Sequence, residues 1–103
     1  MSKRVLLVED ETNIIESLTF ILERAGFDVG FETHGQVALD RLQTEPPDVL
    51  VLDVMLPGID GIEILRRLRE SPAHATLPVL MLTAKGQRED RNLALTSGAD
   101  LFI

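Results

Sequence analysis

The chain has 103 residues, 45 % of them hydrophobic and 26 % charged, which is typical of one folded globular domain and excludes both a two-domain architecture and intrinsic disorder. It contains no cysteine, which excludes disulfides, cysteine nucleophiles and cysteine-ligated zinc or iron–sulfur sites. Seventeen acidic and ten basic residues give a net charge of −7, which disfavours direct binding to nucleic acid because phosphate backbones repel an acidic surface.

The first half of the chain predicts two strands and two helices. Residues 5–8 are apolar at consecutive positions, which is typical of a strand covered on both faces in a parallel sheet. The next segment has helical periodicity, with an apolar stripe in which Ile14, Leu18, Ile21 and Ala25 lie on one line and Ile15 and Leu22 lie beside it. We expect this helix to end at Gly26. A weaker strand over residues 28–32 precedes a second helix over residues 36–44.

The second half continues the same alternation. Residues 49–52 and 79–82 are again continuous apolar runs, and a helix is predicted between them over residues 61–70. A fourth helix is expected over residues 88–97 and a fifth strand over residues 99–103. Alternating strands and helices joined by short loops predict an α/β fold, a doubly wound five-stranded parallel sheet within one domain spanning residues 1–103.

We expect a cytoplasmic protein that does not bind membranes. No apolar run approaches the roughly 20 residues that a membrane-spanning helix needs. The apolar run that follows Lys3 and Arg4 stops at Glu9, and a secretory signal needs an apolar core of about 7–15 residues.

Acidic residues follow the predicted strands at the edge of the sheet where ligand sites form. The first strand is followed by Glu9 and Asp10, the third by Asp53, and the fourth by Thr83. Crowded carboxylates repel one another, and a hard cation such as Mg²⁺ would offset this repulsion, with the Met55 carbonyl as a further ligand. A neutralised carboxylate can act as a nucleophile in aspartyl-phosphate formation, and a threonine hydroxyl can bond a phosphoryl oxygen.

Each of these residues also has a purely structural interpretation. A single Asp after a strand is usually a turn or helix-cap residue, and the Glu9–Glu11 segment could cap the first helix. His34 and His74 fall in predicted loops, where solvated side chains are the norm. The three arginines of the third helix are expected on its solvated face, namely Arg66, Arg67 and Arg69. The joint occurrence of acids at several strand ends favours a functional site.

The chain resembles the receiver domain of two-component response regulators. The resemblance spans the whole chain and is carried by four segments in the family's order and spacing, residues 5–11, 49–61, 78–84 and 97–100. It implies a flavodoxin-like receiver fold with strand order 2-1-3-4-5. It also implies that Asp53 accepts a phosphoryl group from a phosphohistidine, and that Glu9, Asp10, Asp53 and the Met55 carbonyl hold Mg²⁺.

The resemblance assigns further residues to the switching step. Thr83 matches the hydroxyl that moves toward the phosphoryl group, Ala84 leaves it access, and Phe102 falls at the aromatic switch position. The family's phosphoryl-binding lysine, and the fifth helix after it, would lie just past Ile103. We therefore expect a receiver domain that is truncated before its last helix.

The function that this resemblance implies is phosphorelay signal transduction by a regulatory domain that is not an enzyme. The implied partners are a sensor histidine kinase or phosphotransfer protein, with a possible output domain or dimer partner. A magnesium-dependent phosphatase fits poorly, because such enzymes need a second acid where this chain has Met55. A pseudo-receiver, which binds partners without being phosphorylated, is the remaining alternative.

Overall fold

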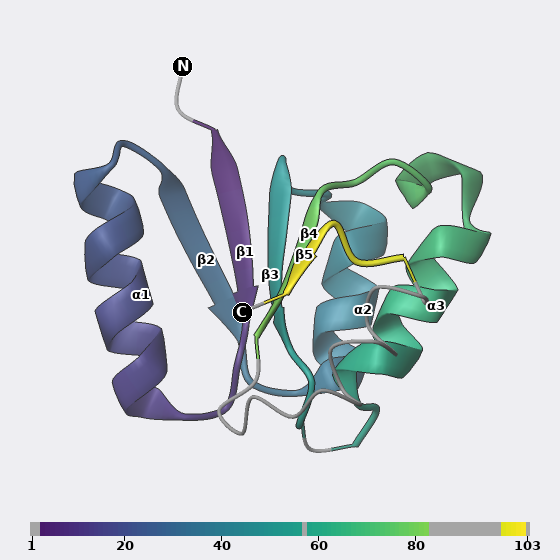
Figure 1. Cartoon of the computed structure of the whole chain (residues 1–103), viewed down its shortest axis with the longest axis horizontal. Helices are drawn as coiled ribbons and strands as arrows, with labels where there is room; N and C mark the ends of the chain where they lie inside the picture. The colour runs from purple at the N-terminus through teal and green to yellow at the C-terminus, as the bar shows by residue number, and fades with distance from the viewer. Residues whose placement is uncertain (1–2, 57, 83–97, 103) are drawn as a thin grey trace.

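The computed structural model describes residues 3–56, 58–82 and 98–102, with only the backbone for residues 101 and 102. Five parallel strands form one sheet in the order β2-β1-β3-β4-β5, as predicted (Figure 1). Their bounds are Arg4–Val8 for β1, Asp28–Glu32 for β2, Val49–Asp53 for β3, Val79–Leu82 for β4 and Leu101–Phe102 for β5.

Helices cover both faces of the sheet. The helix α1, Thr12–Arg24, packs on one face, whereas α2, Gly35–Thr44, and α3, Gly61–Glu70, lie on the other (Figure 1). A short 3₁₀ helix, η1, covers Pro72–His74 after α3. The predicted helix over residues 88–97 lies outside the described residues.

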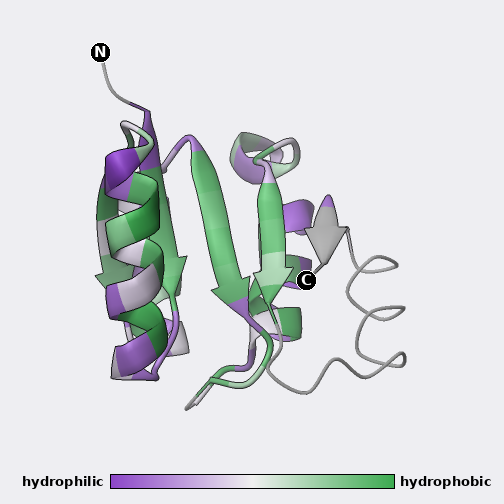
Figure 2. Ribbon diagram, turned by 60° about the vertical axis from the view of Figure 1, so that its left-hand side comes forward, coloured by the Kyte–Doolittle hydropathy of each residue, from purple (hydrophilic) through white to green (hydrophobic). Residues whose placement is uncertain are grey.

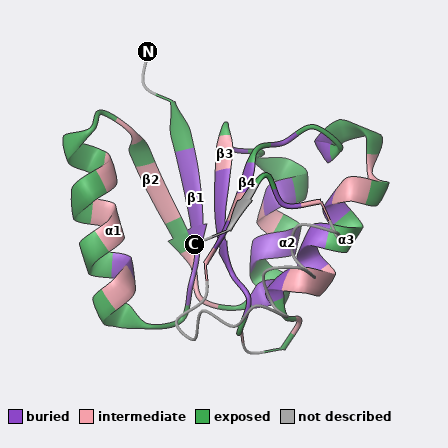
Figure 3. Ribbon diagram, in the orientation of Figure 1, coloured by how far each residue is buried: buried purple, intermediate pink, exposed green. Residues whose placement is uncertain are grey.

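The continuous apolar runs supply two hydrophobic cores, because successive strand residues point to opposite faces. Figure 2 shows β3 and β4 as largely hydrophobic ribbons, and Figure 3 shows β1 and β3 as largely buried. Leu6 and Val8 of β1 belong to the larger core beneath α2 and α3. Val5 and Leu7 belong to the smaller core beneath α1. Burial on both faces explains why these strands do not alternate between apolar and polar residues.

The face that α1 buries lies within the predicted apolar stripe, but to one side of its expected centre. Ile15 is buried and Leu18 and Leu22 pack against the smaller core, whereas Ile21 is 59 % exposed. The buried residues thus follow positions 15, 18 and 22 of the predicted stripe, whereas Ile21, expected on its central line, is exposed; the difference is a small rotation about the helix axis. The predicted stop at Gly26 is confirmed, because Gly26 follows the last turn with a φ of +98°.

The prediction that all three arginines of α3 face solvent is wrong for Arg69. Its side chain is only 17 % exposed. It donates hydrogen bonds to the carbonyl oxygens of Leu77 at 2.8 Å and Gly98 at 2.9 Å. The planar guanidinium offers five donors, so one arginine can satisfy carbonyl groups from several loops at the end of the helix.

His74 is also misplaced by the sequence analysis, which expected a solvated loop residue. It lies in η1 and is 4 % exposed. Its Nε2 donates to the Leu42 carbonyl of α2 at 3.0 Å, and its Nδ1 lies 3.3 Å from the Ser71 hydroxyl. Burial is possible because both ring nitrogens have polar partners. His34, by contrast, is exposed at the start of α2, as predicted.

Candidate functional site

Three acidic side chains converge at the carboxyl edge of the sheet. Glu9 directly follows β1, Asp10 comes next, and Asp53 is the last residue of β3. These two strands pair in parallel, with Val8 opposite Leu52, so their carboxyl ends lie side by side. One carboxylate oxygen from each acid lies within 4.8 Å of the other two. The structure therefore brings together residues that are more than forty positions apart in the sequence.

Glu9 is fixed from several directions. It is 2 % exposed, and its Oε2 accepts hydrogen bonds from the amides of Asp10 at 2.8 Å and Glu11 at 3.2 Å. Its own amide donates to the Glu32 carbonyl of β2 at 3.1 Å. The pKa of Glu9 is raised to about 7, chiefly by burial and also by the neighbouring Asp53, while the hydrogen bonds from the amides of Glu11 and Asp10 act in the opposite direction.

Asp53 is equally constrained. It is 8 % exposed, and burial raises its pKa, with the charge of Asp10 acting in the same direction. Hydrogen bonds from Glu9 and from the amides of Met55 and Val54 oppose that increase. A carboxyl group held in this way binds a proton or a cation more readily than an exposed one.

The acidic cluster has the donor chemistry of a hard-cation site. Among the described residues, the ion pairs involve other acids and none reaches Glu9, Asp10 or Asp53. Desolvation and mutual repulsion thus act on three carboxylates, and no base of residues 3–56, 58–82 and 98–100 forms an ion pair with them. Oxygen ligands at this density suit a divalent cation such as Mg²⁺ or Ca²⁺.

Gly61 sets the distance between α3 and the end of β3. Its amide donates to the Val54 carbonyl at 2.9 Å, and a Cβ at this position would overlap the Asp53 carbonyl oxygen. The sequence analysis included this glycine in the segments that carry the resemblance, but without a role. Its spacing from Asp53 gives no signal for this contact, which depends on how the loop folds back.

The helix-cap alternative for these acids does not account for their contacts. Asp60, not Asp53, caps α3, because its Oδ1 accepts a hydrogen bond from the Glu63 amide at 2.9 Å. Glu11 stands at the N-cap of α1 without a side-chain hydrogen bond to the helix. Glu9 instead binds the amides of the loop that carries Asp10.

The remaining predicted site residues are placed only in part. Met55 follows the cluster and is 58 % exposed, and the metal role of its carbonyl stays a prediction. Thr83 and Ala84 lie outside the described residues. Phe102 lies in β5, opposite Met81 of β4, and only its backbone is described.

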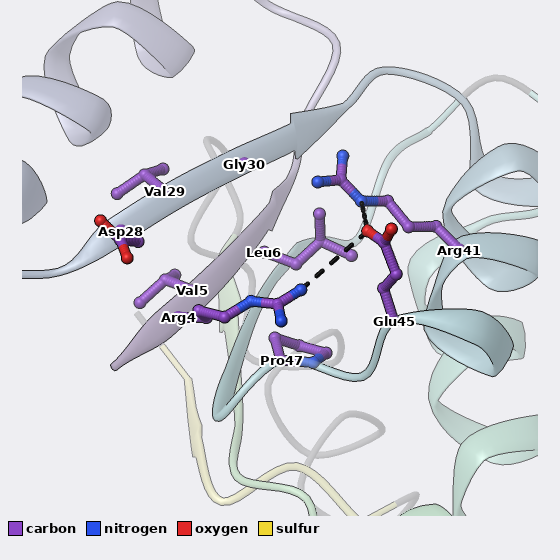
Figure 4. A pocket seen from close by; sticks show the side chains of 9 residues that line it. All are labelled: Arg4, Val5, Leu6, Asp28, Val29, Gly30, Arg41, Glu45 and Pro47. Atoms are coloured by element: carbon purple, nitrogen blue, oxygen red, sulfur yellow. Dashed lines mark ion pairs between the residues drawn. The ribbon is translucent and has the colours of Figure 1, made fainter. Parts of the chain in front are cut away.

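A separate hollow of about 190 Å³ opens at the opposite edge of the sheet, where β1 and β2 begin (Figure 4). Three of its charged groups pair with one another. Glu45 lies 4.0 Å from Arg4 and 3.7 Å from Arg41. Both arginines thus have acidic partners other than the cluster, since Arg41 also pairs with Glu32 at 2.9 Å, and this hollow is not part of the candidate site. In the part of the chain that the structure describes, no helix is long and apolar enough to span a membrane.

Comparisons with known proteins agree on one family. The family model described as "Response regulator receiver domain" matches residues 5–103. Over 103 residues the chain is 47 % identical to the alkaline phosphatase synthesis transcriptional regulatory protein PhoP of Bacillus subtilis, covering 100 % of this chain and 42 % of that protein. It is 44 % identical over 103 residues to the phosphate regulon transcriptional regulatory protein PhoB of Rhizobium meliloti, covering 100 % and 45 %. The chain thus spans less than half the length of these relatives.

A solved structure gives the same result for the fold. The BeF3-activated N-terminal receiver domain of Klebsiella pneumoniae RstA superposes on this chain with a TM-score of 0.89. The two sequences are 31 % identical, and the match covers 97 % of this chain and 83 % of that one. The family resemblance and the flavodoxin-like architecture expected from the sequence are both confirmed.

Proposed function

The chain belongs to the response regulator receiver family, and we propose that it works in a phosphorelay by accepting a phosphoryl group on Asp53. The observation that carries this proposal is the convergence of Glu9, Asp10 and Asp53 within 4.8 Å at the carboxyl edge of the sheet. A receiver domain needs such a cluster to hold a cation beside the phosphoacceptor. In this proposal the role of the chain is regulatory, with at most self-phosphorylation and self-dephosphorylation as its chemistry.

In this proposal Glu9, Asp10 and Asp53 hold Mg²⁺, and the Met55 carbonyl supplies a further oxygen. The ion, when bound, offsets the negative charge of the carboxylates and of an incoming phosphoryl group. The buried Glu9 is held in place by the amides of Asp10 and Glu11, so the cluster is already ordered before a cation arrives.

The transfer step uses the Asp53 carboxylate as the nucleophile. One carboxylate oxygen forms a bond to phosphorus, and the phosphorus–nitrogen bond of the phosphohistidine breaks. The electron pair stays on the imidazole nitrogen, which is left as a neutral ring or takes up a proton. A sensor histidine kinase or a phosphotransfer protein would be the donor.

The response then passes to the switch residues. We assign Thr83 to a hydrogen bond with a phosphoryl oxygen, Ala84 to the space that this contact needs, and Phe102 to the aromatic switch. The relatives PhoP and PhoB are both named as transcriptional regulatory proteins. We therefore infer that this receiver controls an output domain or a dimer partner in a cytoplasmic transcriptional regulator.

The test is magnesium-dependent incorporation of one phosphoryl group from a small phosphodonor, followed by mass spectrometry of the intact chain. We expect incorporation in the wild type and its loss in Asp53→Ala. Asp40→Ala is the matched control, because Asp40 is an exposed acid on α2 that bonds Gln36 rather than the cluster. A folded wild type that gains no phosphoryl group would instead identify a phosphorylation-independent interaction module.

A further inference from the structure

The carboxyl end of β2 is tied to α2 by a single side chain. Arg41 of α2 donates hydrogen bonds to the Glu32 carboxylate at 2.9 Å and to the Phe31 carbonyl oxygen at 3.4 Å. Its Nε also lies 3.7 Å from the carboxylate of Glu45, at the end of α2. The Arg41 side chain is 33 % exposed and that of Glu32 is 23 % exposed, so their ion pair is only partly open to water. One guanidinium thus holds the last two residues of β2, using several of the donors that arginine offers.

Gly30 of β2 provides the space for this contact. It pairs with Leu6 of β1, so it lies on the sheet face that α2 and α3 cover. A Cβ built on Gly30 would lie 2.6 Å from Arg41 Nη2 and 3.3 Å from Arg41 Cζ, so the guanidinium rests on the bare backbone of the strand (Figure 4). Glycine otherwise weakens a strand, because it has the most conformational freedom to lose and no side chain to pack. Its place in the middle of β2 therefore fits a requirement for the arginine.

The end of β2 in turn holds Glu9 of the acidic cluster. Glu32 is opposite Val8 in the parallel pairing of β2 with β1, and the Glu32 carbonyl oxygen accepts the Glu9 amide at 3.1 Å. This bond continues the pairing by one residue beyond β1 and fixes the backbone that carries the Glu9 side chain. That side chain is one of the three that converge at the acidic cluster. A continuous series of contacts therefore leads from Arg41, through Glu32, to the candidate cation site.

We propose that Arg41 is a positioning residue for cation binding, which acts on Glu9 through the end of β2 and depends on Gly30 for its place. The part of this inference that concerns Mg²⁺ rests on the proposed function, whereas the part that concerns the Glu9 backbone does not. Groups that orient metal ligands change metal affinity although they do not touch the ion. By contrast, an ion pair that only joins two surface elements contributes little to stability and has no effect on a distant carboxylate.

Two substitutions separate positioning from simple electrostatics. Arg41→Gln removes a positive charge, and this change alone would strengthen the binding of a cation. Loss of positioning has the opposite effect, because a less ordered Glu9 must be fixed when the cation binds. Gly30→Ala is the sharper variant, since its methyl group would displace the flexible end of Arg41 without changing any charge. Alanine is also a better strand residue than glycine, so this variant should remain folded.

The experiment measures two quantities on the whole chain by amide NMR. These are the hydrogen-exchange rate of the Glu9 amide without metal and the dissociation constant for Mg²⁺ alone. We expect Arg41→Gln and Gly30→Ala to speed exchange at Glu9 about tenfold, with a smaller change at Val51 in the middle of β3, and to raise the dissociation constant about fivefold. Arg41→Lys should recover part of both losses, because an ammonium group can reach Glu32 but lacks the planar fork that also reaches a second acceptor.

Arg4→Gln is the matched control, because Arg4 lines the same hollow but lies at the start of β1 and pairs with Glu45 at 4.0 Å. It removes the same charge, and it should neither speed exchange at Glu9 nor weaken Mg²⁺ binding.

Three results would overturn the proposal. These are unchanged exchange at Glu9 in Gly30→Ala, equal acceleration at Glu9 and Val51, or an affinity for Mg²⁺ that Arg41→Gln leaves unchanged or strengthens. If the wild type binds no Mg²⁺, the proposed function fails instead, and the exchange rates alone still decide whether Arg41 positions Glu9.

Discussion

Arg69 and Asp100 form a hydrogen-bonded ion pair, with 3.1 Å between Arg69 Nη2 and Asp100 Oδ2, although they are 31 positions apart. The same Asp100 oxygen accepts the Val79 amide at 2.8 Å. Arg69 also bonds the carbonyl oxygens of Gly98 and Leu77. One side chain thus joins the end of α3, the start of β4 and the segment that leads into β5, the strand of the proposed switch residue.

We expect Arg69→Ala to lower the free energy of unfolding by about 3 kcal/mol, because several partly buried carbonyl groups lose a charged donor. Arg69→Lys should recover little, since an ammonium group cannot reproduce the planar fork. Urea unfolding followed by circular dichroism measures both, as the chain has no tryptophan or tyrosine. Arg66→Ala is the control, with an exposed ion pair to Glu63 and an expected loss below about 0.5 kcal/mol. If Arg69→Ala and Arg66→Ala lower the free energy of unfolding equally, the hydrogen bonds of Arg69 do not stabilise the fold as described.

The contact between Gly61 and Asp53 leads to a second prediction. Gly61→Ala should cost about 2–3 kcal/mol of stability, because its Cβ would overlap the Asp53 carbonyl oxygen and force backbone to move. Gly26→Ala is the comparison, where nothing lies within 4 Å and only the positive φ of +98° is unfavourable. That variant should lose about 1 kcal/mol, and Gly26→Asn less. If Gly61→Ala and the wild type unfold at the same urea concentration, residue 61 does not lie as close to the Asp53 carbonyl oxygen as described.

The raised pKa of Glu9 predicts how stability depends on pH. The folded chain keeps a proton on Glu9 up to a pKa of about 7, whereas the unfolded chain releases it near 4.5. Protonated Glu9 therefore makes its full contribution to the free energy of unfolding below about pH 4.5. This contribution, about 3 kcal/mol in total, is lost as the pH rises through 7. The raised pKa of Asp53 acts in the same direction.

Urea unfolding at a series of pH values, without divalent cations, measures this loss of stability. Two further measurements show whether Glu9 causes it. Glu9→Gln should flatten the decline, because glutamine does not titrate. Added Mg²⁺ should restore stability above pH 7, since the cation replaces the proton as the partner of the carboxylates. Stability that rises across this range in the absence of cations would show that Glu9 is already ionised in the folded chain.

The different burial of the two histidines leads to a fourth prediction about stability. His74→Phe should cost about 1–3 kcal/mol, because it leaves the buried Leu42 carbonyl without its donor. His34→Phe should change stability by less than about 0.5 kcal/mol, since His34 is exposed at the start of α2. Thermal unfolding of the two variants provides the measurement. A larger loss in His34→Phe would contradict the contacts described for His74.

Much of the fold could be predicted because strands and helices have distinct apolar periods. The runs at residues 49–52 and 79–82 predicted strands buried on both faces, and the third helix was predicted with the bounds that the structure has. The convergence of Glu9 and Asp53 was also predictable, because parallel strands place their carboxyl ends at one edge.

The contacts that could not be predicted from the sequence depend on the tertiary structure. Arginine on a helix is usually solvated, and nothing local distinguishes Arg69 from Arg66, whose side chain is 57 % exposed. Loop residues are usually exposed, and the burial of His74 depends on a carbonyl of α2 that lies 32 positions away. The helical period also left a rotation of α1 open, because Ile14, Ile15 and Ile21 are all apolar.

The dependence of phosphoryl incorporation on Mg²⁺ concentration tests the central claim most directly. With a small phosphodonor in excess, the wild type should reach one phosphoryl group per chain, mapped to Asp53 by fragmentation. Asp10→Asn and Glu9→Gln should need at least about tenfold more Mg²⁺ to reach half of that level, because each removes a proposed ligand. Incorporation that is independent of Mg²⁺, or that reaches wild-type levels in Asp53→Asn, would contradict the account.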